Sequence, residues 1–141
     1  MFNQLKEVVP DLIFGPVVLD ANNTPAAVSL ANHESALVSI AVGIGGVTFT
    51  SSNKIEFKLT HCATEDGSYA AVAQADVRGV TVGTGGIVLS LVTEQAAASV
   101  TTLSYVGGNR YLKLLADFGG THGTGTPITA MIVRGHPHAS T

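Results

Sequence analysis

Residues 55–61 read Ile-Glu-Phe-Lys-Leu-Thr-His, and they carry the clearest structural signal in the sequence. An apolar side chain stands at every second position, and the residues between are charged or carry a hydroxyl group. That alternation is typical of a β-strand with one buried face and one face in water. Glu65-Asp66-Gly67 is a tight-turn signal. We therefore expect residues 68–73 to run back as the hairpin partner of this strand.

Short apolar segments separated by turn residues continue on both sides of this hairpin. Parallel α/β folds need helices between their strands. Residues 93–98 are the interior segment with helix propensity, and they are too few to form a stable helix alone. The sequence therefore predicts an all-β protein, an antiparallel β-sandwich or jelly roll. The other expected strands lie at residues 17–19, 26–30, 36–42, 47–50, 80–82, 87–92, 100–105, 111–118 and 128–133.

The chain divides into an N-terminal arm or short helix at residues 1–15, a β-sandwich domain at 16–135 and a C-terminal tail at 136–141. The arm has more apolar residues than one short segment leaves in water. We expect it to pack on a neighbouring subunit; the alternative is that it folds back onto its own sandwich. Its candidate interface residues are Phe2, Leu5, Val8, Val9, Leu12 and Phe14.

Composition excludes several classes of function. Charged residues are 12% of the 141 residues, about half of the usual ~25%, and the net charge is −3. The Lys and Arg residues are scattered, which argues against direct nucleic-acid binding. No apolar run has the length of a membrane helix, and the N-terminus lacks the pattern of a signal peptide. The uncharged exterior has two interpretations: other subunits cover it, or it is the surface of a small, turn-rich β domain.

The possible chemical sites are weak, and we expect no enzyme activity, cofactor or metal. Residues 43–46 and 83–86 are Gly-rich but lead into strands, so they are predicted turns and not phosphate loops. His61 and Cys62 are neighbours on a strand and point to opposite faces, which prevents a His–Cys dyad. The His136-Pro137-His138 spacing suits metal ligands, but a solvated or interface-docked tail is the preferred interpretation.

Arg110 and Tyr111 are residue types common at interface hot spots. The alternative for them is the water-facing side of an ordinary strand. Together with His136 and His138, they complete the set of candidate interface residues.

Three segments resemble small virion proteins of tailed phages. Residues 57–69 resemble their hairpin of an alternating strand, an acidic turn and an aromatic residue. Residues 109–113 resemble a second marker, Arg-Tyr followed by alternating apolar residues, and residues 132–137 resemble their Gly-His-Pro ending. The chain has no Trp after the acidic turn, where the common pattern has one.

The resemblance implies a capsid decoration, or cement, protein on the capsid surface of the virion, made in the host cytoplasm. Its expected partners are the major capsid protein and its own copies, with a homotrimer suggested by the family. The alternatives are a carbohydrate-binding jelly-roll module, a tail or connector component and, third, a cupin-like metalloenzyme.

Overall fold

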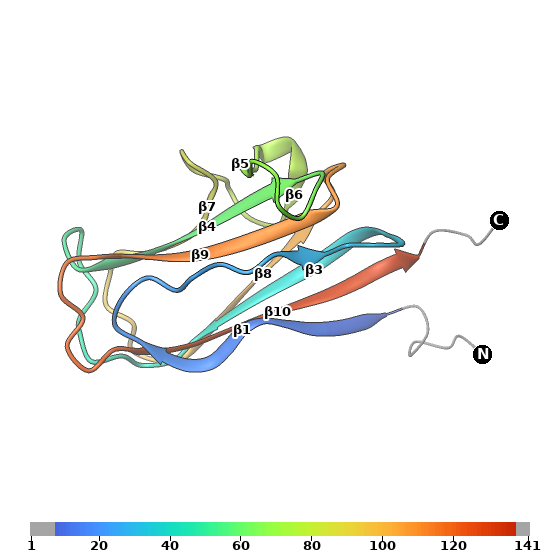
Figure 1. Ribbon diagram of the computed structural model, residues 1–141. Helices are drawn as coiled ribbons and strands as arrows, with labels where there is room; N and C mark the ends of the chain where they lie inside the picture. The colour runs from blue at the N-terminus through green and yellow to red at the C-terminus, as the bar shows by residue number, and fades with distance from the viewer. Residues whose placement is uncertain (1–7, 138–141) are drawn as a thin grey trace.

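The structure of the protein is a computed structural model that describes residues 8–137. It contains two antiparallel five-stranded sheets packed face to face, which confirms the predicted all-β sandwich (Figure 1). In the first sheet, β1 (Val9–Leu19), β10 (Thr126–Pro137), β3 (His33–Val42), β8 (Ser99–Tyr105) and β6 (Val77–Arg78) follow in spatial order. In the second, β2 (Val28–Ser29) and β9 (Tyr111–Gly119) lead to β4 (Lys54–Cys62), whose far edge pairs with both β5 (Ala70–Ala71) and β7 (Ile87–Leu91).

The strands are paired as in one long hairpin folded over on itself. β4 pairs with β7, β3 with β8, β2 with β9 and β1 with β10, so each pair encloses the one before it along the chain. Successive pairs alternate between the two sheets. Two further pairings, β10 with β3 and β9 with β4, join the halves within each sheet. This nested order is the jelly-roll arrangement.

The core lies between the sheets and follows the alternation that the sequence shows. Ile55, Phe57 and Leu59 of β4 are fully buried, as expected. Val38 and Ile40 of β3 are equally buried on the facing sheet. Burial of each such side chain contributes about 1.5–3 kcal/mol, so these inward faces supply most of the driving force for folding.

β1 departs from the expected boundaries. Val9 lies opposite Arg134 and Phe14 opposite Ala130, so residues 9–15 pair with β10, and the arm boundary expected after residue 15 falls inside a strand. Gly15 has a φ of +79°, and the register shifts on both sides of Phe14. Gly15 and Pro16, which suggested that the arm ends there, instead lie at bulges within a strand that continues past them. β10 likewise extends to Pro137, past the expected start of the tail, and residues 1–7 lie outside the described residues.

Two other expected strands are loops. Residues 47–50 and 80–82 are not strands in the structure. Val47, Val80 and Val82 still pack against the core, which explains their apolar character. Residues 74–76, which the sequence did not distinguish, form a single 3₁₀ turn. Among residues 8–137, no helix has the length and hydropathy that a membrane span requires.

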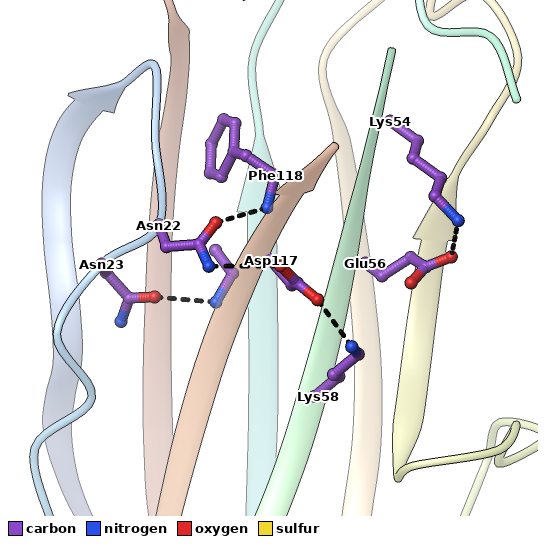
Figure 2. A network of polar contacts seen from close by, with 8 residues as sticks. Asn22, Asn23, Lys54, Glu56, Lys58, Asp117 and Phe118 are labelled. Atoms are coloured by element: carbon purple, nitrogen blue, oxygen red, sulfur yellow. Dashed lines mark hydrogen bonds and ion pairs between the residues drawn. The ribbon is translucent and has the colours of Figure 1, made fainter. Parts of the chain in front are cut away.

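Two asparagines that precede β2 complete the hydrogen bonding of β9 beyond its pairing with β2 (Figure 2). The Asn23 side chain accepts a hydrogen bond from the Ala116 amide at 2.7 Å and donates one to the Leu114 carbonyl at 3.2 Å. The Asn22 side chain accepts from the Phe118 amide at 2.6 Å. These amides take the place of a neighbouring strand, so this part of the sheet edge is not free to pair with another chain.

We predict that Asn23→Ala lowers the free energy of unfolding by about 1–3 kcal/mol, because a buried amide and a carbonyl lose their partner. Urea unfolding measures the change, with the slope expected to stay constant. Asn23→Asp keeps the side-chain acceptor but not the donor, so its free energy of unfolding should lie between those of the wild type and Asn23→Ala. Thr24→Ala, at an exposed neighbouring position, serves as the control. A midpoint for Asn23→Ala equal to that of the control contradicts the prediction.

Candidate interaction surfaces

The outer face of the second sheet carries charges that are paired with one another. Lys58 Nζ lies 2.6 Å from Asp117 Oδ2 across β4 and β9, and Lys54 pairs with Glu56 along β4 (Figure 2). Asn22 donates a second hydrogen bond to Asp117 at 3.2 Å. The hydrogen bond from Lys58 lowers the pKa of the Asp117 carboxyl group, and the same contact raises the pKa of Lys58. This face is an ordinary water-facing sheet surface.

The outer face of the first sheet is different, because four of its five strands, β1, β10, β3 and β8, present no Lys, Arg, Asp or Glu there. We call it the uncharged face: the outward positions of β1, β10, β3 and β8. Apart from His33 at the start of β3, every described side chain at these positions is apolar or carries a hydroxyl group. They are Pro10, Leu12, Val18, Pro127, Thr129, Met131, Val133, Ser35, Leu37, Ser39, Ala41, Val100, Thr102 and Ser104.

The register arranges the uncharged face in rows that cross the strands. The first row joins Pro10, Val133, Leu37 and Ser104. The second row joins Leu12, Met131, Ser39 and Thr102, and the third joins Thr129, Ala41 and Val100. On β3 the first row carries the large Leu37 and the third the small Ala41, whereas Val133 and Thr129 of β10 are similar in size.

Several large apolar side chains on this face are open to water. Val100 is 68% exposed, Leu12 49%, Leu37 40% and Met131 39%. Beside them is an apolar hollow of about 250 Å³. Its lining includes Pro16, Ala41, Gly43, Val100, Pro127 and Thr129. Exposed apolar side chains next to an apolar hollow are the characteristics of a protein interaction surface.

Charges begin at the borders of this face. Asp11 and Arg134 stand at inward register positions and pair with each other at 3.2 Å. Arg134 also donates to the Ser29 carbonyl of the opposite sheet at 3.0 Å, which ties the two layers together. Arg78 of β6 lies beyond Ser104 and hydrogen-bonds to backbone carbonyls of Ala75 and Val77.

The candidate interface residues from the sequence do not form one site. Leu12 lies on the uncharged face, and Phe14 is half-buried against the core. Val8 is exposed just before β1, and Val9 is its first residue.

The other candidates lie elsewhere. Arg110 is exposed just ahead of β9 and lines a hollow of about 490 Å³ at one end of the sandwich, and Tyr111 opens β9 on the opposite sheet from Leu12. His136 lies in β10, and Phe2, Leu5 and His138 lie outside the described residues.

Sequence reasoning missed the residues at the centre of the uncharged face. Leu37, Val100 and Met131 each belong to a strand that the sequence predicted. A signal was present: residues 35–42 of β3 and all of β8 lack charge at both inward and outward positions. A strand that is uncharged on both faces is typical of one covered on both sides.

A polar cluster inside the sandwich has a structural explanation. His61 Nδ1 and the Tyr105 hydroxyl, from opposite sheets, are hydrogen-bonded at 2.8 Å, and Asp76 lies 4.0 Å from His61 Nε2. Tyr105 is fully buried, and burial raises the pKa of its phenol. A protonated, buried phenol links the sheets and is a poor nucleophile. Cys62 points the other way, toward Thr64, as expected for a neighbour on a strand.

Residues 8–137 contain no group of three or more His, Cys, Asp or Glu side chains that could hold a metal ion. No protein-family model, curated protein or solved structure matches this chain. The candidate site therefore rests on the geometry of the two outer faces.

We predict that Asp117→Asn destabilises the protein at neutral pH by about 0.5–1 kcal/mol, because the ion pair with Lys58 is partly exposed. The lowered pKa of Asp117 means that its carboxylate stabilises the fold above the unfolded pKa of about 3.9. That contribution is lost as the pH falls through the lower, folded pKa. The stability gap between wild type and variant should therefore close below about pH 4.

Urea unfolding at neutral and acidic pH, at one ionic strength, measures this gap. The variants Lys58→Met and Lys58→Met/Asp117→Asn complete a double-mutant cycle that isolates the coupling of the pair. A gap that is constant with pH would show that the carboxylate does not stabilise the fold through its charge.

Proposed function

We propose that this chain is a non-enzymatic structural protein of a virus particle, which decorates and stabilises a phage capsid through subunit contacts. The observation that supports this proposal is the uncharged face. A catalyst needs a site with reactive groups, whereas an assembly protein needs a surface that a partner can cover.

The energetics favour a covered face. Leu12, Leu37, Met131 and Val100 are at least one-third exposed and are neighbours on adjoining strands. Removing apolar area from water contributes about 25 cal/mol per Å². Monomeric proteins seldom expose a contiguous apolar patch larger than a few hundred Å² without a function for it. The second sheet, with its ion pairs, provides the solvated side of the same molecule.

The resemblance to phage virion proteins is the reason for proposing that the particle is a phage capsid. The acidic-turn hairpin follows β4, the Arg-Tyr marker opens β9, and the Gly-His-Pro ending closes β10. Jelly rolls occur in viral capsid proteins and in lectins, so the architecture suits the proposal without fixing it. The partners proposed are the major capsid protein and further copies of this chain.

The carbohydrate-binding alternative requires an open aromatic platform. Lys113 Nζ lies 4.2 Å from the centroid of the Tyr69 ring and occupies one face of it. Tyr105 is fully buried. Tyr111 is the remaining tyrosine and is half-buried. The aromatic residues therefore favour assembly over sugar binding.

We predict that the purified protein co-sediments saturably with empty capsid shells of the phage that encodes it. Leu37→Lys places a charge on the uncharged face and should weaken this binding at least about tenfold, the effect of losing an interface hot spot. The measurement is the bound fraction in the pellet as a function of protein concentration.

Ser90→Lys is the matched control, because Ser90 is exposed on β7 and lies opposite Glu56 on the charged sheet. It should bind shells as the wild type does. Wild-type protein that stays in the supernatant at every concentration contradicts the proposed function. If Leu37→Lys binds shells as tightly as the wild type, the uncharged face is not the surface that supports shell binding.

A further inference from the structure

We propose that a second copy of this chain packs on the uncharged face, so that the first sheets of two molecules stack face to face. The two copies are related by a two-fold axis that lies in the interface and crosses the strands at the row of Ser39 and Met131. This inference rests on the proposed assembly function and assigns the uncharged face to the contact between copies, so Leu37→Lys would weaken shell binding by separating the copies.

Charge is the first argument for a second copy. Two charged faces of one kind repel each other when they meet, and a charge buried against an uncharged surface loses its hydration without gaining a partner. The uncharged face avoids both costs when it meets itself. The Ser39 and Thr102 hydroxyls lie 3.5 Å apart, so these two polar groups on the face can satisfy each other inside a contact.

Shape is the second argument, because Leu37 and the apolar hollow beside Ala41 lie on opposite sides of the Ser39 row. Leu37 and Val133 stand one row before Ser39, and Ala41 and Thr129 stand one row after it. A two-fold axis along the Ser39 row places Leu37 of one copy over Ala41 of the other, where the apolar hollow lies. Val133 comes to lie over Thr129. Leu12 and Met131, in the central row, meet their own counterparts.

The other route to self-association, edge to edge, is obstructed at one edge of each sheet. β1 is the outer strand of the first sheet, and it contains Pro10, Pro16 and two register shifts. Prolines and bulges on an edge strand hinder the addition of a further strand. On the second sheet, Asn22 and Asn23 occupy the β9 edge. Face-to-face packing is therefore the favoured contact, with the strands of the two sheets aligned to within about 30°.

The area sets the expected strength. Strands lie about 4.8 Å apart and rise about 3.3 Å per residue, so four strands over seven residues cover roughly 19 Å by 23 Å, or about 440 Å² per copy. The pair then buries about 900 Å² in projection, near the lower limit of roughly 1,000–1,200 Å² for specific interfaces. We expect a reversible dimer with a Kd in the micromolar range or weaker.

The test is the solution mass of the full chain, measured without capsid shells by sedimentation velocity over a range of concentrations. The mass should rise from one chain of 14.4 kDa to twice that value. Ser39→Lys should remain a monomer at concentrations where the wild type is a dimer, because the axis brings the two introduced charges together. Ser39→Glu should do the same. An equimolar mixture of the two variants should restore the dimer.

Ser90→Lys on the charged face again serves as the control and should dimerise as the wild type does. Thr102→Lys, in the same row as Ser39, replaces Ser39→Lys if that variant unfolds. Three results would each overturn the inference: wild-type protein that is monomeric at millimolar concentration, a trimer, or a dimer that Ser39→Lys leaves intact. Failure of the mixture to dimerise overturns the two-fold arrangement. Because shells are absent, none of these results depends on whether the protein binds a capsid.

Discussion

The burial of one face of each sheet against the other is the interaction on which the rest of this structure depends. Side chains on a strand alternate between two faces, so the register that buries Phe57 and Ile40 also fixes what faces outward. On β4 the outward residues include Lys58 and Glu56, which form ion pairs, whereas on β3 they include Leu37, Ser39 and Ala41. The difference between the two outer faces therefore follows directly from the packing of the core.

The fold could be predicted from the sequence where the signals are local. The alternation at residues 55–61 identified β4 and its buried face, and the Gly-rich segment at 83–86 was recognised as a turn, with Gly85 and Gly86 at φ values of +77° and +81°. The prediction began the strand only at residue 17, because Gly15 and Pro16 are typical of a strand boundary. The strand continues through them because it pairs with β10, which is distant in the sequence. The segments around Val47, Val80 and Val82 were predicted as strands because they are apolar. They are apolar because these valines pack against the core from loops.

The uncharged face could not be found in this way, because it depends on which strands are neighbours. Val100, Leu37 and Met131 are far apart in the sequence and meet only when β8, β3 and β10 align. The sequence shows that residues 35–42 and β8 lack charge on both faces, but it does not show that these strands are neighbours in one sheet. Prolines and bulges protect the β1 edge of the first sheet, asparagine amides occupy the β9 edge of the second, and one broad face is left open. The molecule is thus built to resist uncontrolled strand addition while retaining a flat surface for a specific contact.

The nested pairing also has a consequence for how the chain reaches this structure. Ile55 lies opposite Leu91, whereas Val9 lies opposite Arg134 at the other extreme of the sequence. Each outer pair requires a longer loop to close than the pair inside it, and closing long loops early is entropically unfavourable. Loop closure therefore favours early pairing of β4 with β5 and β7 over pairing of the terminal strands. Contacts so distant in sequence place the protein among slow-folding topologies.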